Sequence, residues 1–261
     1  MSAPRPVCLI TGGASGLGRA AARRFARAGY DLVLGDIDRA AGESAAAEIA
    51  SLGAGAKFVA TDVADPDAAA RLVEAAMAVF GRLDCAVNSA GIEGSRGPVA
   101  DYEVEEARRI VAVNLMGVFF AMKHEIAAML ECGGGAIVNI GSSAGLRGTP
   151  RMAAYSATKH ALVGLTRAAA LEYAERGIRI NLVSPGSFVT PMSERLYGED
   201  AAQVLASVTP MLRAGSVDEI AEAIFWLASP AASFVTGANL AVDGGKTAGA
   251  MQGRSAVWKN G

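Results

Sequence analysis

The stretch that decides the fold is residues 11–21, Thr11-Gly12-Gly13-Ala14-Ser15-Gly16-Leu17-Gly18-Arg19-Ala20-Ala21. It follows a short apolar run at residues 7–10 and opens a segment at 15–29 that has helical spacing. Gly16-x-Gly18-x-x-Ala21 matches the G-x-G-x-x-G/A pattern, in which glycines let the backbone approach a pyrophosphate and a helix N-terminus faces the phosphates. Because a strand precedes the glycines and a helix follows them, the sequence predicts a dinucleotide site rather than a turn that only packs a helix on a strand.

The same alternation of a short apolar run and a longer helical segment continues along the chain. The predicted strands are 7–10, 31–36, 57–60, 83–88, 136–140, 178–183 and 238–242, and the predicted helices are 15–29, 39–52, 66–80, 103–130, 153–175 and 217–227. Repeated strand–helix units with apolar strands predict a single α/β domain over residues 1–261, a Rossmann-type doubly wound parallel sheet with helices on both faces. We expect residues 190–212 to form a helical flap over the substrate, and the tail at 246–261 has no readable structure.

Composition excludes several classes of protein. The chain has 261 residues, a formal net charge of −2 and no basic surface typical of proteins that bind nucleic acid or anionic membranes. No stretch reaches the roughly 18 apolar residues of a membrane span. The three cysteines, Cys8, Cys85 and Cys132, include no CxxC pair, which argues against a disulfide framework and favours a cytoplasmic location. Two scattered histidines without paired carboxylates predict no metal site.

An acidic residue at the end of the second predicted strand bears on the choice of cofactor. Asp36 lies 18 residues beyond Gly18, where a carboxylate can accept hydrogen bonds from the adenosine ribose hydroxyls. A 2′-phosphate would face that carboxylate, and no Arg or Lys lies in 12–18 or directly after Asp36 to offset the repulsion. Arg39 is the nearest cation and is expected to belong to the next helix, so the sequence favours NAD over NADP. Asp62 follows the third strand, where it either hydrogen-bonds the adenine amino group or caps the helix near Asp65-Pro66.

A tyrosine and a lysine near the start of the helix at 153–175 form the candidate catalytic pair. Tyr155 and Lys159 are four residues apart and therefore share one helix face. A free tyrosine has a pKa of about 10, and a neighbouring ammonium would lower it. Ser142 precedes Tyr155 by 13 residues and ends the fifth predicted strand, at the same sheet edge as the glycine-rich turn. Its hydroxyl could hold a substrate oxygen, and Ser143 is the rival for that role.

Together these segments resemble the short-chain dehydrogenase/reductase family, in its compact single-domain form. The resemblance covers residues 7–245, and further matching elements are Asn88-x-Ala90-Gly91, Asn114, Pro185-Gly186 with Thr190, and Val242-Asp243-Gly244-Gly245. One departure is visible, because the family commonly has two consecutive asparagines where this chain has Asn88-Ser89. The serine puts one structural hydrogen bond in doubt but not the activity.

The resemblance implies a catalytic tetrad of Asn114, Ser142, Tyr155 and Lys159. Tyr155 would be the general acid/base, Ser142 would orient the substrate oxygen, and Lys159 would lower the Tyr155 pKa and hold the nicotinamide ribose. Asn114 would support a water that links Lys159 to solvent, and the 13-residue interval selects Ser142 over Ser143. Beyond the catalytic pair, the implied NAD contacts are Gly12, Ser15, Gly16, Leu17, Gly18, Asp36, Ile37, Asp62, Val63, Asn88, Ala90, Gly91, Pro185, Gly186, the Val189 backbone and the Thr190 hydroxyl.

The function expected from these features is NAD-dependent interconversion of a secondary alcohol and a ketone. The rival functions are an NADPH-dependent 3-oxoacyl-type ketoreductase, which Asp36 opposes, and a non-catalytic dinucleotide-binding protein, which usually lacks the tyrosine or lysine. We expect the substrate pocket at 93–96, 144–152 and 190–211, whose apolar members Leu146, Met152, Phe188, Met192, Leu196 and Tyr197 suit an apolar or cyclic substrate. Arg147 or Arg96 could admit an acidic group or could simply be solvated. By the same resemblance, the helices at 103–130 and 153–175 would form a homotetramer contact.

Overall fold

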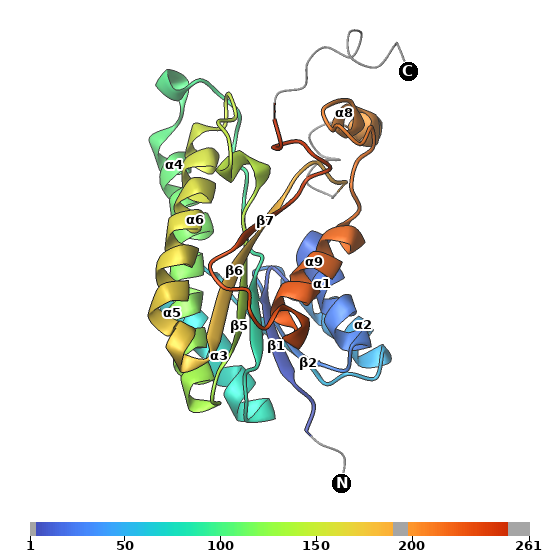
Figure 1. The fold of residues 1–261 in the computed structure, drawn as a ribbon, viewed down its shortest axis with the longest axis vertical. Coiled ribbons are helices and arrows are strands. Elements are labelled where there is room, and N and C mark those ends of the chain that lie inside the picture. The colour runs from blue at the N-terminus through green and yellow to red at the C-terminus, as the bar shows by residue number, and fades with distance from the viewer. Residues whose placement is uncertain (1–3, 190–197, 250–261) are drawn as a thin grey trace.

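A seven-stranded parallel sheet forms the centre of the molecule (Figure 1). The structure is a computed structural model, and it describes residues 4–189 and 198–249. In these residues the strand order is β3-β2-β1-β4-β5-β6-β7, the doubly wound order that the sequence predicts. The strands are β1 (Val7–Thr11), β2 (Asp31–Asp36), β3 (Ala56–Ala60), β4 (Cys85–Asn88), β5 (Gly135–Ile140), β6 (Ile178–Pro185) and β7 (Asn239–Val242).

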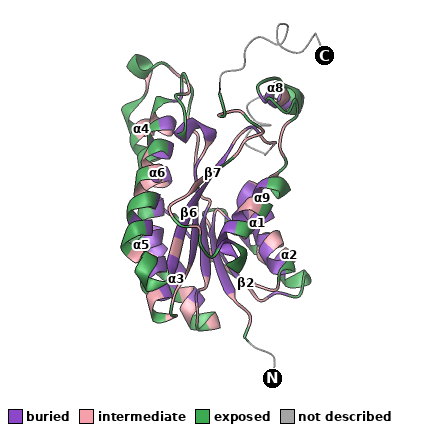
Figure 2. Cartoon of the chain, in the orientation of Figure 1, coloured by how far each residue is buried: buried purple, intermediate pink, exposed green. Residues whose placement is uncertain are grey.

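Helices cover both faces of the sheet, so its central strands are buried on both sides (Figure 2). The helices are α1 (Gly16–Arg27), α2 (Arg39–Ser51), α3 (Pro66–Phe80), α4 (Val104–Val111), α5 (Gly117–Glu131), α6 (Ala153–Tyr173), α8 (Ala201–Ser207) and α9 (Val217–Ala228). Helices α1, α2 and α9 pack on one face, and α3, α5 and α6 pack on the other (Figure 1). Two apolar clusters result, one around Phe25 and Ile224 and one around Met129 and Leu162.

Local sequence signals explain where these elements begin and end. All five residues of β1 are buried, as expected for a parallel strand covered on both faces. Asp65 accepts a hydrogen bond from the Asp67 amide, and Pro66 follows it in the first turn of α3, where its missing N–H is not needed. Gly29, the predicted stop signal, follows α1 with a φ of +89°, a left-handed conformation that glycine adopts without strain.

The predicted helix at 103–130 is confirmed as a continuous helical segment, Val104–Glu131, with a π-helical turn in its middle. The chain forms α4, then a π-helical turn at Ala112–Met116, and then α5. The π turn contains Asn114, whose side chain forms hydrogen bonds with the backbone of Ile92. Turns of this kind are frequent at functional sites. The segment Val104–Glu131 is apolar and long enough to span a membrane by composition, with a mean hydropathy of 1.4, but here α5 packs against the sheet through residues such as Met122 and Met129.

Two segments without a clear sequence pattern lie beyond the carboxyl ends of the strands. The described part of the predicted flap, from residue 198 onward, contains a 3-10 turn and α8, which lies apart from the sheet (Figure 1). The described part of the predicted tail, 246–249, is attached to the sheet edge, because the Thr247 amide donates to Asp243 at 2.9 Å and Lys246 Nζ donates to Ser187 Oγ at 2.7 Å.

A buried polar network joins α5 to the sheet. Glu125 is fully buried, and its carboxyl Oε2 accepts a hydrogen bond from Asn88 Nδ2 at 3.0 Å. Asn88 Nδ2 also donates to Asn139 Oδ1, and Asn139 Nδ2 donates to Thr166 Oγ1, each at 3.0 Å. Burial raises the pKa of Glu125 to about 8, and the Asn88 hydrogen bond offsets only part of that rise. Glu125 is therefore protonated in the folded protein at neutral pH.

The protonated state of Glu125 makes stability depend on pH. Because the folded pKa exceeds that of the unfolded chain, the folded state binds the extra proton and loses stability as pH rises from the ordinary glutamate pKa of 4.5 to about 8. We expect Glu125→Gln, which cannot ionise, to be nearly as stable as the parent near pH 5 and more stable at about pH 8, by a few kcal/mol at about 1.4 kcal/mol per pKa unit. Urea denaturation at both pH values measures the difference, and a difference that does not change with pH would contradict this prediction.

Candidate active site

A cavity of about 730 Å³ opens at the carboxyl ends of the strands. It is lined by the turns after β1, β2, β4, β5 and β6 and by the first turn of α6. Ligands of doubly wound sheets bind at this edge, and the volume lies in the range of about 300–1,000 Å³ that is typical of small-molecule sites. The cavity is thus the candidate ligand site.

The glycine-rich turn after β1 forms a cradle for phosphate. Gly12 and Gly16 have φ values of +67° and +51°. A Cβ on Gly18 would lie 2.1 Å from the Gly12 carbonyl oxygen, so only glycine lets helix α1 start this close to the strand. Ser15, the N-cap of α1, makes no side-chain capping bond, and the first turn contains no acid. The open N-terminus of α1 therefore fits the pyrophosphate of a dinucleotide.

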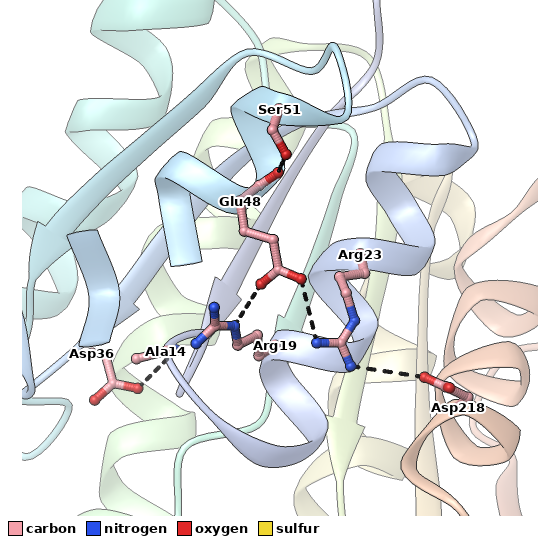
Figure 3. Close-up of polar contacts among 7 residues, drawn as sticks. All are labelled: Ala14, Arg19, Arg23, Asp36, Glu48, Ser51 and Asp218. Carbon is pink, nitrogen blue, oxygen red and sulfur yellow. Dashed lines mark hydrogen bonds and ion pairs between the residues drawn. The ribbon is translucent and has the colours of Figure 1, made fainter. Parts of the chain in front are cut away.

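Asp36 lies at one end of the cavity and is held by the glycine-rich turn (Figure 3). Its Oδ2 accepts a hydrogen bond from the Ala14 amide at 3.0 Å, and its Oδ1 accepts one from the Asp38 amide at 3.1 Å. Ile37, next to it, is 73% exposed although it is a large apolar residue, and it lines the cavity together with Val63. These groups fit an adenosine, with the carboxylate at the ribose and apolar side chains at the base.

The sequence predicts that Asp62 either hydrogen-bonds the adenine or caps helix α3, and the cap of α3 is a different residue. Asp65, not Asp62, caps α3 with its side chain. Asp62 Oδ1 accepts a hydrogen bond from the Ala64 amide at 3.0 Å, and the residue lines the cavity. The capping role is therefore filled by another residue, and Asp62 faces the adenosine end.

Two arginines of the helices on either side of Asp36 in the sequence, Arg19 in α1 and Arg39 in α2, each have an acidic partner. Arg19 Nε lies 2.6 Å from Glu48 Oε2, and Figure 3 shows Glu48 held between Arg19 and Arg23. Arg39 lies in α2 as expected, and its Nη1 is 3.8 Å from Glu43 Oε1. Both cations are thus partly neutralised within the protein.

The predicted catalytic residues converge on the opposite part of the cavity. Tyr155, Lys159 and Ser142 all line it. The Ser142 hydroxyl is close enough to the Tyr155 phenol to lower its pKa, which favours Ser142 over Ser143, although Ser143 also lines the cavity. Lys159 is buried, and its Nζ donates to the Ile140 carbonyl at 2.8 Å and lies 5.7 Å from the centre of the Tyr155 ring.

The pKa values at this pair differ from the sequence expectation. Burial raises the pKa of Tyr155 to about 12, while the Ser142 hydroxyl lowers it and the nearby Glu93 carboxylate raises it. Burial also lowers the pKa of Lys159 to about 8. Burial is the largest influence on the Tyr155 pKa, and the Lys159 Nζ donates to the Ile140 carbonyl at 2.8 Å. The phenol is protonated at neutral pH.

Asn114 is fully buried, and both polar atoms of its side-chain amide form hydrogen bonds with the backbone of Ile92. Its Oδ1 accepts from the Ile92 amide and its Nδ2 donates to the Ile92 carbonyl, each at 2.8 Å. A point beside Gly91, where a Cβ would lie, is 3.2 Å from Asn114 Oδ1 and 3.8 Å from Lys159 Nζ. Asn114 and Lys159 thus flank the same space.

Most predicted cofactor residues line the cavity, and a few do not. The lining includes Gly12, Ser15, Gly16, Leu17, Gly18, Ala90, Gly91, Pro185 and Gly186. The side chain of Asn88 is not on the cavity wall, because the Glu125 network binds it in the core. Val189 is not among the lining residues either, and Thr190 lies outside the described residues.

Of the residues predicted for the substrate pocket, some line the cavity and others do not. Met152 and Phe188 line the cavity, and Leu205 and Val208, from the predicted flap, do so as well. Leu146 is 41% exposed and is not part of the wall. Met192, Leu196 and Tyr197 lie outside the described residues.

Two contributors were missed from the sequence. Thr11 Oγ1 accepts hydrogen bonds from the amides of Ser89 and Ala90 at 3.1 and 3.3 Å and so holds the turn after β4 against β1. A hydroxyl at the end of a buried strand was the available signal. Lys246 lines the cavity from the predicted tail, and no local pattern points to it. Within 4–189 and 198–249, no group of three or more His, Cys, Asp or Glu side chains could hold a metal ion.

The fold is of the Rossmann type, and a tyrosine, a lysine and a serine line the same cavity as its glycine-rich turn. A family model described as enoyl-(acyl carrier protein) reductase matches residues 12–247. The chain belongs to the short-chain dehydrogenase/reductase family, as the sequence motifs indicate.

Similar proteins of this family include dehydrogenases and reductases named for cyclic substrates. The chain is 42% identical to a cyclohexanol dehydrogenase of Acinetobacter sp. over 92% of its own length and 94% of that protein. It is 43% identical to a cis-4-hydroxycyclohexanecarboxylate dehydrogenase of Sinomonas cyclohexanicum, over 93% and 96%. The crystal structure of levodione reductase superposes with a TM-score of 0.90 at 38% identity, covering 94% of this chain and 98% of that one.

Proposed function

We propose that this enzyme interconverts a cyclic secondary alcohol and the corresponding ketone with NAD(H), and that Tyr155 carries the proton. The observation that supports this most directly is that Ser142, Tyr155 and Lys159 line the same cavity as the glycine cradle. The names of the relatives, a cyclohexanol dehydrogenase and a levodione reductase, agree with a ring-bearing substrate.

In the proposed reaction, the coenzyme, Tyr155 and Ser142 each have a separate role. Bound NAD(H) would accept or supply the hydride, and the protein supplies position and a proton path. In ketone reduction, Tyr155 is the acid, and its raised pKa of about 12 keeps the proton on the phenol until the carbonyl oxygen becomes basic. Ser142 holds the same oxygen and orients it. In alcohol oxidation the phenolate is the base, so this direction is favoured by rising pH.

A route for the proton back to solvent is available next to the catalytic pair. Lys159, with a pKa of about 8, can gain or lose a proton near neutral pH. Asn114 Oδ1 has a second lone pair beyond its bond to Ile92, and it flanks the same space beside Gly91 as Lys159. A water between these two groups would complete the relay that the family resemblance implies.

Two features favour NAD over NADP. The Asp36 carboxylate lines the adenosine end and would repel a 2′-phosphate, and its hydrogen bonds to the turn fix it there. Arg19 and Arg39, the cations that could offset the repulsion, are paired with Glu48 and Glu43. Similar solved structures occur with NAD⁺ and with NADPH, so similarity alone does not choose between them.

The two rival functions are disfavoured on separate grounds. Asp36 opposes the NADPH-dependent 3-oxoacyl-type ketoreductase for the reason just given. A non-catalytic dinucleotide-binding protein would not need the tyrosine, the lysine and the serine to face one cavity, and this chain retains all three.

The proposed function is tested by following the formation of NADH, through the absorbance of the reduced nicotinamide, with a panel of cyclic and acyclic secondary alcohols. We expect turnover with cyclic alcohols and NAD⁺, and less turnover with NADP⁺. An enzyme that binds NADH but oxidises none of the alcohols and reduces none of the ketones would be evidence for the non-catalytic alternative.

We also propose that the enzyme is a homotetramer of a reducing, cytoplasmic environment. Exposed apolar side chains on the outer helix layer, among them Val104, Phe119 and Leu171 at 60, 48 and 82% exposure, support burial by other subunits. The three cysteines are free, and Cys8 and Cys85 are buried. Light scattering of the purified protein gives the number of subunits directly.

A further inference from the structure

The charged residues of the cavity lining include more cations than acids. The acids are Asp36, Asp62 and Glu93. The cations are Arg96, Arg109, Arg147, Lys159 and Lys246. Glu93 is close enough to Tyr155 to raise the pKa of the phenol, and Arg96 Nη2 lies 3.7 Å from Glu93 Oε2. Arg96 is therefore a cation of the wall close to the reacting phenol.

Lys246 is held in this wall by the protein. Its Nζ donates to Ser187 Oγ at 2.7 Å, and the side chain is partly buried. Burial lowers the pKa of Lys246, and the positive charges of Arg147 and Arg96, which line the same cavity, lower it further. Asp243 acts in the opposite direction, but its carboxylate already accepts hydrogen bonds from the amides of Gly245 and Thr247, each at 2.9 Å.

The protein supplies less negative than positive charge to the group Arg96, Arg147 and Lys246. Glu93 is paired with Arg96, and Asp243 is the carboxylate that acts on Lys246. Among the described residues, no hydrogen bond or ion pair holds Arg147, which lines the cavity. One positive charge of the three is therefore left without an acidic counterpart, and Arg147 and Lys246 both line the cavity.

We infer that Arg147 and Lys246 form a subsite for an anionic group on the substrate, so that the enzyme prefers a secondary alcohol carrying a carboxylate. The inference rests on the proposed function, because the subsite is defined relative to an alcohol held at Tyr155. A carboxylate there would accept charge-assisted hydrogen bonds from both side chains and relieve their mutual repulsion. Glu93, which faces the phenol, would keep the anionic end of the substrate away from the reacting carbon and so fix its orientation.

The coenzyme pyrophosphate is the other anion that could occupy such a site. The glycine cradle and the open N-terminus of α1 already provide for it, on a different part of the lining. The two possibilities make opposite predictions, because loss of Lys246 or Arg147 would weaken NADH binding only if these residues held the pyrophosphate.

A matched pair of substrates tests the inference by kinetics. A hydroxycyclohexanecarboxylate and the corresponding hydroxycyclohexanecarboxamide have nearly the same shape and differ in charge. For the parent enzyme we expect kcat/KM to be about tenfold or more higher with the acid, which is the range of charged hydrogen bonds. In Arg147→Gln and Lys246→Met, this preference should fall about tenfold through KM, while kcat for the amide stays close to that of the parent.

Controls separate the subsite from general effects. Arg108→Gln removes one positive charge from an exposed arginine that is paired with Glu105 outside the cavity, and it should retain the preference for the acid. Thermal unfolding verifies that Lys246→Met is folded, and Arg147→Gln changes an exposed residue. NADH titration of both variants should give the dissociation constant of the parent.

A binding experiment remains informative if turnover is not found. Calorimetric titration of the enzyme–NADH complex with cyclohexanecarboxylate and cyclohexanecarboxamide needs no reaction, and we expect tighter binding of the acid, lost in both cavity variants. Equal or weaker binding of the acid, or an unchanged preference in both variants, would overturn the subsite. Turnover of neutral alcohols with no preference for the acid would overturn the subsite alone, whereas a preference in binding without any turnover would leave the subsite and overturn the proposed reaction.

Discussion

Tyr155→Phe is expected to reduce turnover by about a thousandfold or more, within the range of about 10²–10⁴ for loss of a general acid/base and above it where no water substitutes. The substitution removes one oxygen atom and leaves the ring that lines the cavity. Without the hydroxyl, no group at that position can protonate a ketone or accept the proton of an alcohol. Ser142 is unchanged and would still be able to contact the substrate oxygen.

The binding of NADH separates this outcome from misfolding. The glycine cradle, Asp36 and Lys159 are unchanged, so NADH fluorescence titration should give a dissociation constant within about threefold of the parent, the usual context-dependent scatter. Tyr173→Phe is the matched control, because Tyr173 lies at the far end of the same helix, packed against the core and away from the cavity. Full activity in Tyr155→Phe would exclude the phenol as the proton carrier.

Asp36→Ala is expected to change the coenzyme preference by about 100-fold or more, as the product of two effects. Loss of hydrogen bonds to the ribose should lower kcat/KM for NAD⁺ about tenfold, and removal of the repulsive charge should raise kcat/KM for NADP⁺ by a similar factor. The two initial rates measured over a range of coenzyme concentrations give the ratio. Both coenzymes will also bind less tightly, because Asp36 holds the Ala14 amide of the cradle.

Two further variants resolve the cause of that change. Asp36→Asn keeps an acceptor for the Ala14 amide and removes the charge, so it should improve NADP⁺ with less damage to NAD⁺. Adding Glu48→Gln releases Arg19 from its 2.6 Å ion pair and should raise NADP⁺ use again if the guanidinium then reaches the phosphate. A preference that stays with NAD⁺ in all three variants would remove Asp36 from the ribose site.

Much of the fold could be predicted from local patterns. Strands buried on both faces need continuous apolar runs, and those runs identified all seven strands of the sheet to within a few residues. The glycine-rich turn was equally readable, because the approach of Gly18 to the Gly12 carbonyl permits no side chain. The edge of the sheet then placed Ser142, Tyr155 and Lys159 on one cavity.

What could not be predicted depends on contacts between distant residues. The π turn at Asn114 arises from a bond to Ile92, 22 residues away, and the helical period does not reveal it. The side chain of Asn88 turns to Glu125 in the core, 37 residues away, rather than to the cavity. Lys246 reaches Ser187 across 59 residues from a segment with no regular pattern. The pKa of Tyr155 is raised mainly by burial, which its four-residue spacing from Lys159 does not reveal.

The π turn between α4 and α5 also constrains how this family member can diverge. It contains one residue more than an α-helical path between the same two ends, and each residue of a helix advances about 100° around its axis. Removing a single residue there would rotate α4 relative to α5 by about that angle and take the Asn114 amide off Ile92. A deletion within Ala112–Met116 should therefore move Asn114 out of the space that it shares with Lys159.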